Sequence, residues 1–411
     1  MEQQNLSATN ERILFMDNVR YLMVLLVVVL HICCAYSILT QWWPVNDKNA
    51  APFSIILLIL DVILMPTLFF ISGYFALCSI QSKSTVGFIK RKIFRLGVPW
   101  IIGVIMIHPI TVLAYCMSRN YPINLWDTFI NSSKKILQFY TGIINNSIHF
   151  NQTHLWYISL LLFFLIVFAV LYKLKIKLIQ NNESVILKKS ASSKKILLSF
   201  IFAAICTAVL SIILYINFVQ FMGKEPWLLI ASFIQFQPTR IAIYVVCFIL
   251  GIFAFHNHWF IDGKVPLHPA VWSILSAILF ICLIITAKAN VQSGFNNSTI
   301  IYAYIFFRVF AIFSTILALL SLSGRYWQSA SKINLSLAQN SYIIYLIHLP
   351  IVFAFQLILL KFDISLYLKF FIGSAGSIAA SYLISEFTFR RYPKASTMVL
   401  IVLFAIGICL I

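Results

Sequence analysis

Apolar segments of membrane length recur along the whole chain, and they constrain its fold more than any other feature. A helix needs about 20 apolar residues to cross the hydrocarbon core of a bilayer. Of the 411 residues, 61% are hydrophobic and 10% are charged, which is more apolar surface than a soluble core can bury. The sequence therefore predicts an all-α polytopic bundle of transmembrane helices. About eleven candidate spans, ten in the core and one at the C-terminus, lie near residues 19–39, 52–78, 97–117, 154–172, 196–217, 238–256, 268–288, 300–322, 341–360, 365–386 and 395–411.

The charges in the connecting segments predict the orientation of the bundle. The segments after the second, fourth and tenth spans are rich in lysine and arginine, whereas the segments after odd-numbered spans are sparse or mixed in charge. By the positive-inside rule, the N-terminus then lies in the cytoplasm. We expect a cytoplasmic tail over residues 1–16, a membrane domain over residues 17–391 and an additional C-terminal transmembrane helix over residues 392–411. The formal net charge of +19 is therefore interpreted as a topology signal, and no nucleic acid partner is expected.

The first span, from Asp17 to Ile38, contains two ionisable side chains that are costly at bilayer depth. Arg20 lies near its start and His31 near its middle. Eleven positions are close to three helical turns, so both side chains project from one face, about 16 Å apart. Asp17 lies one turn before Arg20. These residues are candidate functional groups, and the alternative is that His31 is a buried histidine packed against a neighbouring helix.

The second and eighth spans also contain polar side chains at membrane depth. Asp61 is a carboxylate in the second span, and Arg308 is a guanidinium in the eighth. They are interpreted either as a pair that holds helices together or as supporting residues of a functional site. Ser72 and Gly73 follow in FFISGYF at residues 69–75, where small residues allow helices to approach closely.

Two further histidines lie in or beside predicted spans. His154 begins the fourth span in HLWYISLL, where Trp156 and Tyr157 are typical of an aromatic belt at the membrane surface. His348 lies inside the ninth span, two residues before Pro350. It is interpreted either as a helix-packing histidine beside a proline kink or as a supporting functional residue.

A basic stretch precedes the third span. Lys90, Arg91, Lys92 and Arg95 alternate with apolar residues on the predicted cytoplasmic side. Such a patch attracts anionic membrane lipid. It equally suits the phosphates of a soluble substrate, because arginine binds phosphate through two parallel hydrogen bonds.

Other classes of site are not indicated by the sequence. His256, His258 and His268 lie around one loop, but we expect no metal site there. The eight cysteines are scattered through apolar runs and are interpreted as small core residues. The sequence contains no phosphate-binding glycine loop and no pattern typical of a Ser-His-Asp triad.

The motifs described above occur in the order seen in the acyltransferase family 3 membrane proteins. The chain resembles this family from about residue 12 to about residue 391. It is most similar to the branch that includes the glucan-modifying succinyltransferases, on the residues of the first span together with Asp61 and His348. The ordered set consists of Arg20 followed by His31, FFISGYF at 69–75, KRKIFRLGVP at 90–99, HLWYISLL at 154–161 and SYIIYLIHLP at 341–350.

This resemblance implies an integral membrane O-acyltransferase of the bacterial inner membrane. Acyl-CoA would be the co-substrate, a hydroxyl of a cell-envelope carbohydrate or polyol would be the acceptor, and no permanently bound cofactor is expected. His31 and Arg20 are the catalytic residues that the resemblance implies, with Asp17 orienting Arg20. Burial favours a neutral imidazole, which suits His31 to act as a general base. The basic stretch from Lys90 to Arg95 would bind the donor, while the choice of acetyl or succinyl group and the formation of a homo-oligomer are left open.

Two other classes of function remain open on the residues alone. A transporter or exporter of envelope polysaccharide or of a small solute also buries His, Asp and Arg side chains, along a proton or substrate pathway. A sensor or scaffold has no turnover at all. Consumption of a thioester without net sugar movement distinguishes the enzyme from the transporter.

Overall fold

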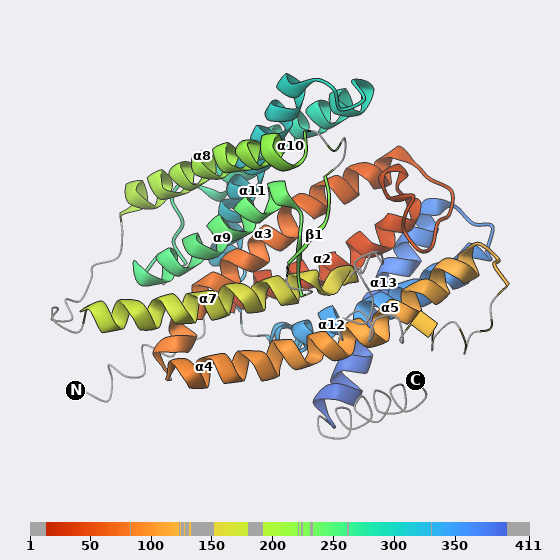
Figure 1. The fold of residues 1–411 in the computed structure, drawn as a ribbon, viewed down its shortest axis with the longest axis horizontal. Helices are drawn as coiled ribbons and strands as arrows, with labels where there is room; N and C mark the ends of the chain where they lie inside the picture. Colours follow the sequence, from red (N-terminus) through yellow and green to blue (C-terminus); the bar gives the residue numbers. More distant parts are fainter. Residues whose placement is uncertain are drawn as a thin grey trace.

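The computed structural model describes residues 14–392, apart from 83, 123, 125–126, 128–130, 133–151, 180–191, 221, 223–224, 231–232, 261–262 and 330. Within this part, ten helical segments are long and apolar enough to cross a membrane, so the predicted all-α polytopic bundle is confirmed. The eleventh predicted span, 395–411, lies outside the described residues. Figure 1 shows most of the helices running along the long axis of the molecule.

The ten spans follow one another up and down the bundle. Their helices are α2 (Leu14–Cys33), α3 (Ala51–Gln81), α4 (Thr85–Lys92) continuing through a π-helical turn (Ile93–Gly97) into α5 (Val98–Ser118), α7 (Trp156–Ile179), α8 (Ser193–Phe218), α9 (Pro238–His256), α10 (Pro269–Gln292), α11 (Ser298–Tyr326), α12 (Lys332–Leu360) and α13 (Leu366–Ile384), which ends in a second π-helical turn (Ser385–Arg390).

Several helices begin earlier than their apolar stretches. Helix α2 begins at Leu14 rather than near residue 19, and α12 begins at Lys332 rather than near residue 341. Hydropathy marks only the part of a helix that suits hydrocarbon, whereas a polar first turn is stabilised by its own cap. At the start of α12, the Ser331 side chain accepts a hydrogen bond from the backbone N–H of Asn334. Helix α2 also ends at Cys33 rather than near residue 39, which places His31 in its last turn, so the prediction that His31 lies near the middle of the span is corrected.

The two ends of the bundle differ in character. The end called the basic end below carries the start of α2 and the turn between α3 and α4 that precedes the basic stretch. The opposite end, called the far end, carries the loop 37–50 and the starts of α7 and α9. The positive-inside prediction assigns the basic end to the cytoplasm.

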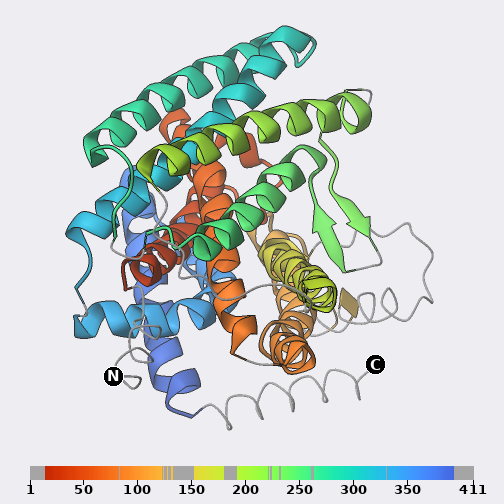
Figure 2. The ribbon, with the colours of Figure 1, turned by 90° about the vertical axis from the view of Figure 1, so that its left-hand side faces the viewer.

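Helix α2 lies inside the bundle, where it contacts α3, α11, α12 and α13. In Figure 2, its red ribbon lies between the orange ribbon of α3 and the blue ribbons of α12 and α13. Of its most apolar stretch, 61% is buried by protein, whereas the corresponding value for α10 is 17%. Polar residues of α2 therefore face other helices, and α10 is a peripheral helix that packs on α11.

Helices α3 and α9 approach each other at two glycines. A methyl group added to Gly73 would collide with the backbone carbonyl of Phe248, and one added to Gly251 would collide with the carbonyl of Phe70. Backbone cannot yield as a flexible side chain can, so only glycine fits at these two positions. The close approach expected at Gly73 is confirmed, and it brings the polar residues of α3 against those of α9.

A short β-hairpin precedes α9 and departs from the purely helical pattern. Strands β1 (Leu228–Ile230) and β2 (Ile234–Phe236) are antiparallel, with Leu228 opposite Phe236. Figure 2 shows this hairpin beside α7, and β2 makes the contact with that helix.

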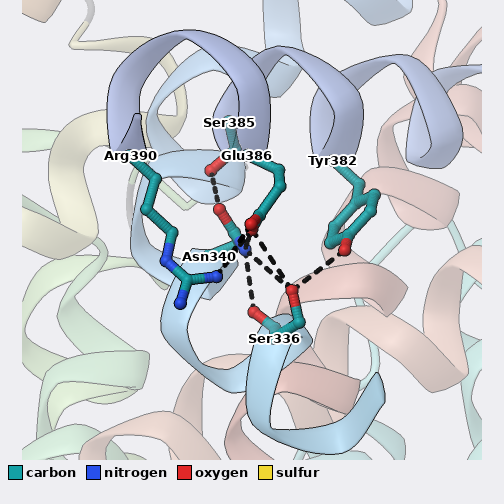
Figure 3. Close-up of polar contacts among 6 residues, drawn as sticks. All are labelled: Ser336, Asn340, Tyr382, Ser385, Glu386 and Arg390. Carbon is teal, nitrogen blue, oxygen red and sulfur yellow. Dashed lines mark hydrogen bonds and ion pairs between the residues drawn. The ribbon is translucent and has the colours of Figure 1, made fainter. Parts of the chain in front are cut away.

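Figure 3 shows a polar cluster that holds the start of α12 against the end of α13. Asn340 donates a hydrogen bond of 2.6 Å to the Glu386 carboxylate and accepts one of 2.6 Å from Ser385. Ser336 contacts both Glu386 and Tyr382, and Arg390 forms an ion pair with Glu386 at 2.7 Å. Hydrogen bonds between helices replace lost contacts with water in the membrane, so this cluster fixes the position of α12.

Candidate functional site

Three histidines from different parts of the chain meet toward the far end of the bundle. His31 is in the last turn of α2, His348 is in α12, and His154 is in a 3₁₀ turn immediately before α7. The ring centroid of His348 lies 5.0 Å from that of His31 and 4.6 Å from that of His154. His348 is fully buried, His154 is nearly so, and His31 is partly exposed. We call these residues the histidine cluster.

The hydrogen bonds of His348 define the proton positions in the neutral cluster. His348 Nδ1 lies 2.7 Å from the carbonyl oxygen of Tyr345, and a carbonyl only accepts, so this nitrogen carries the proton. His348 Nε2 is then an acceptor, and it lies 2.9 Å from His31 Nδ1, which must donate. In the neutral pair, Nε2 of His31 is left as the basic nitrogen. His154 Nε2 lies 3.1 Å from the same Tyr345 carbonyl.

The buried side chain of Gln152 holds the segment that carries His154. Next to it, Thr153 has a φ of 52°, a backbone conformation that a β-branched residue adopts only when its surroundings impose it. The hydrogen bonds of Gln152 supply that constraint. Its backbone N–H donates to Gln235 Oε1 at 2.9 Å and its side-chain nitrogen donates to the Phe233 carbonyl at 3.0 Å, which joins it to the hairpin. Its side-chain oxygen accepts from Trp100 and Ser159.

Trp43 covers His31 from the side of loop 37–50. The two rings are stacked, with centroids 5.4 Å apart and an interplanar angle of 12°. Trp43 Nε1 donates to Gln356 Oε1 at 3.1 Å, and Gln356 Nε2 donates to the backbone carbonyl of His31 at 2.9 Å. The last carbonyls of an α-helix have no partner within the helix, so Gln356 completes the end of α2 while it positions the tryptophan.

The same loop is fastened to the rest of the far end. Asp47 forms an ion pair of 2.6 Å with Lys369 of α13, and both side chains are at most 10% exposed. Arg119 donates to the carbonyl of Pro44 at 2.7 Å. A pocket of about 470 Å³ lies beside the ion pair and is lined by residues 47–48, 360–366 and 369. The loop is therefore held over the histidine cluster next to an open polar pocket.

Arg20 and Asp17 lie at the other end of α2, toward the basic end. Their side chains form an ion pair of 2.8 Å, and the Arg20 side chain is 35% exposed. With about 1.5 Å of rise per residue, Arg20 is about 16 Å from His31 along the helix, so the two do not touch the same reacting atom.

Ser72 of α3 and Tyr157 of α7 form a polar contact inside the bundle, with their hydroxyl oxygens 3.2 Å apart. Tyr157 is 8% exposed and packs against Tyr345 at 5.6 Å between ring centroids. Trp156 packs against Tyr244 at 5.4 Å. Tyr157 is therefore buried between helices rather than placed in an aromatic belt, whereas Trp156 is half-buried and its place in such a belt stays a prediction.

Three charged residues from α3, α9 and α11 form what we call the charge cluster. Asp61 accepts a hydrogen bond of 2.7 Å from Arg240 Nη1, and Arg308 Nη2 lies 3.9 Å from the other carboxylate oxygen. Arg308 is thus the more distant of two cations around Asp61. Glu225 also lies near Arg240, but its carboxylate accepts from the backbone and hydroxyl of Thr239 and caps the first turn of α9.

The basic stretch lies on α4 and the π-helical turn that follows. Lys90, Arg91 and Arg95 are exposed, and Lys92 lies over the Phe88 ring at 5.1 Å. The carbonyl of Arg95 accepts a hydrogen bond of 2.7 Å from a tyrosine hydroxyl of α12, at residue 342. π-helical turns frequently occur at functional sites, and this one carries Arg95 beside the exposed Lys90 and Arg91 of α4.

Metal ligation is not indicated among the described residues. No group of three or more His, Cys, Asp and Glu side chains there has an arrangement that could hold a metal ion. The nitrogens of the histidine cluster instead bond one another and the backbone. His256 and His258 are both exposed, and His268 caps the start of α10 through its ring nitrogen.

Sequence reasoning missed five residues that complete these clusters. Arg240 and Gln356 lie inside predicted spans, so their cost at membrane depth was a signal that could have identified them. Trp43 and Gln152 lie in connecting segments, where neither residue type is unusual. Tyr345 contributes a backbone carbonyl, which no residue type reveals.

Residues 13–386 match the model of the acyltransferase domain that defines acyltransferase family 3. The chain belongs to this family. The match covers most of the chain, from the start of α2 to Glu386 at the end of α13, so the family resemblance is confirmed and the protein is a multi-pass membrane acyltransferase. No curated protein and no solved structure matches the chain.

Proposed function

We propose that this acyltransferase moves an acyl group from acyl-CoA to a hydroxyl of a cell-envelope carbohydrate in a bacterial inner membrane, with His31 as the general base. The observation that carries the proposal is the directed hydrogen-bond chain from the Tyr345 carbonyl through His348 to His31. It supports His31 rather than His348 as the base, because both nitrogens of His348 are occupied and its side chain is fully buried. His31 is partly exposed and keeps a basic Nε2.

The proposed reaction needs only groups that the two substrates and His31 supply. The acceptor hydroxyl transfers its proton to His31 Nε2 while its oxygen attacks the thioester carbonyl carbon, and the carbonyl electrons move to oxygen. Collapse of this tetrahedral intermediate breaks the C–S bond. The departing CoA sulfur takes the proton from His31, which restores the neutral ring. A positioned base of this kind contributes about 10²–10⁴-fold to a transfer rate.

The proposed substrates approach from opposite ends of the bundle. The phosphates of acyl-CoA suit the exposed Lys90, Arg91 and Arg95 at the basic end, and Arg20, oriented by Asp17, lies on the same face of α2 as His31. The carbohydrate suits the far end, where Trp43 stacks on His31 and a polar pocket lies beside Asp47. Holding both substrates across one membrane helix supplies the proximity that a bimolecular transfer requires.

The His31→Ala variant tests the proposal. We expect acyl transfer by the purified variant to fall by about 10²–10⁴-fold. Expression and melting temperature should stay near those of the wild type, because a small apolar residue inserts into a membrane at least as well as histidine. Transfer to envelope carbohydrate and CoA release would be followed in parallel in proteoliposomes. The matched control is His256→Ala, which removes an exposed histidine at the end of α9.

Two results would contradict the proposal. If His31→Ala keeps more than about a tenth of the wild-type transfer rate, His31 does not act as the base, since a positioned base contributes far more than that. If the wild type moves sugar across the membrane without consuming a thioester, the protein is a transporter.

A further inference from the structure

The charge cluster contains a buried cation whose hydrogen-bonding capacity is not used. Arg308 is 6% exposed, and within the described residues none of its N–H groups is in a hydrogen bond. Its carboxylate neighbour Asp61 is 3.9 Å away and is already bonded to Arg240 at 2.7 Å. Among the described residues, the Nε atoms of Arg240 and Arg308 are both buried without a hydrogen-bond partner. A buried guanidinium without acceptors is unfavourable, so this arrangement is suited to a further acceptor.

Two side chains of the charge cluster are accessible to such an acceptor. Asp61 lies eleven positions into α3 and is surrounded by protein, yet 34% of its side-chain surface is accessible. The Arg240 side chain is 20% accessible. The two side chains are therefore partly accessible rather than tightly packed, and an oxygen-bearing anion that reached them would meet two arginine forks.

The charge cluster is close to the histidine cluster. The turn Cys34–Tyr36, which begins three residues after His31, contacts α3, the helix that carries Asp61. On the other side, Tyr244 beside Arg240 stacks on Phe69 with centroids 4.9 Å apart, and Phe69 meets Tyr157 at the same distance. Tyr157 packs on Tyr345, whose backbone carbonyl accepts hydrogen bonds from the histidine cluster. A continuous path of packed aromatic rings therefore connects the two clusters.

We propose that Asp61, Arg240 and Arg308 form a subsite for an oxyanion, a carboxylate or phosphate carried by one of the two substrates of the transfer reaction. The inference rests on the proposed function and identifies a determinant of its specificity. Arginine forks bind both oxyanions through paired charged hydrogen bonds. Asp61 holds Arg240 in place and limits the affinity for anions, so bound substrate can be released. The oxyanion is either the far end of a dicarboxylic acyl group or a substituent of the acceptor.

The first experiment measures anion binding without turnover. The melting temperature of the full-length protein in neutral detergent would be followed against sodium succinate and inorganic phosphate, with sodium chloride at equal ionic strength as reference. We expect a saturable stabilisation of the wild type that is absent in Arg308→Gln. Asp61→Asn should keep or increase it, because that variant removes a competing carboxylate. Arg325→Gln, an exposed arginine on the same helix, is the matched control and should respond like the wild type.

The opposite responses of two variants separate a binding site from a structural ion pair. If the cluster only holds helices together, Asp61→Asn and Arg308→Gln lower the melting temperature alike and neither changes the response to anions, which overturns the proposal. The absence of a saturable response in the wild type overturns it as well. If Arg308→Gln does not fold, Arg308→Lys keeps the charge without the fork, and we expect it to fold and to show a weakened anion response.

The second experiment identifies which substrate carries the oxyanion. With acetyl-CoA and succinyl-CoA as donors, Arg308→Gln should raise the apparent KM for succinyl-CoA by about tenfold or more if the acyl group carries it, because a charged hydrogen bond is lost. The KM for acetyl-CoA should not change. If the acceptor carries the oxyanion, Arg308→Gln should impair transfer only to a phosphorylated acceptor. If Arg308→Gln impairs transfer equally with every donor and acceptor, the subsite proposal is overturned. If the wild type binds anions but consumes no thioester, only the proposed function is overturned.

Discussion

At the scale of single residues, the direction of one hydrogen-bond chain matters more than the presence of a histidine. His348 donates from Nδ1 to a backbone carbonyl and accepts at Nε2 from His31. It therefore acts as a positioning residue that selects the tautomer of His31 and fixes the plane of its ring. Trp43 restrains the same ring from the other side.

His348→Ala removes the acceptor for His31 Nδ1–H, so both tautomers of His31 become available. We expect kcat to fall by about 10- to 100-fold, the usual scale when the partner that orients a functional histidine is lost. The KM for the donor should change little. His348→Gln supplies a side-chain oxygen that can accept the same hydrogen bond, so part of the rate should return. Nitrogen NMR of the imidazole would follow the tautomer directly. If the alanine and glutamine variants lose activity equally, His348 only fills space.

At the scale of elements, the site depends on how closely α3 and α9 approach. Asp61 and Ser72 are on α3, and Arg240 begins α9, so a shift between these two helices would separate the charge cluster. The two glycines that meet opposing backbone carbonyls, Gly73 and Gly251, determine that spacing.

Gly73→Ala and Gly251→Ala should each destabilise the protein by about 1–3 kcal/mol, because the added methyl group meets backbone that cannot move aside. Thermal unfolding in detergent measures this loss. Gly373→Ala in α13 is the matched control, since its methyl group would meet only the ends of the Ile32 and Leu359 side chains at 3.3 Å. If the three variants unfold at the same temperature, the α3–α9 contact is looser than the structure indicates.

At the scale of the whole molecule, the exposed cations of the basic stretch lie apart from the histidine cluster. The exposed cations of the basic stretch lie at one end, and the histidine cluster lies toward the other, with α2 reaching both. This arrangement suits a donor that is held by its phosphates at the basic end while its acyl group extends to His31.

Replacing Arg91 and Arg95 with glutamine should raise the apparent KM for acyl-CoA and leave the affinity for the acceptor nearly unchanged. Lys90 and Lys92 remain and should compensate in part, because each still contributes a positive charge. Steady-state kinetics with each substrate varied in turn measures the two effects. If the folded variant binds the donor as well as the wild type does, the basic stretch serves only as a lipid anchor and topology signal.

The sequence alone determined the kind of fold and the family. Runs of about 20 apolar residues have one stable solution in a bilayer, the helix, because backbone groups find no water there. The order of short motifs indicated the acyltransferase family, and the periodicity of α2 placed Arg20 and His31 on one face. Helix ends were less accurate, because apolar residues continue past the end of α2 at Cys33 into the turns that follow, and His31 was placed too deep for that reason.

Only the tertiary structure decided which helices are neighbours. His31 and His348 are 317 positions apart in the chain, and Asp61 and Arg240 are 179 apart, so no local pattern relates them. Every helix of the bundle is apolar enough to pack on any other, and polar residues inside spans show that partners exist without showing which. Close backbone contact at glycines and hydrogen bonds between helices select the pairs. They leave His31 bonded to His348 through Nδ1 alone and, among the described residues, leave Nε of Arg308 without an acceptor.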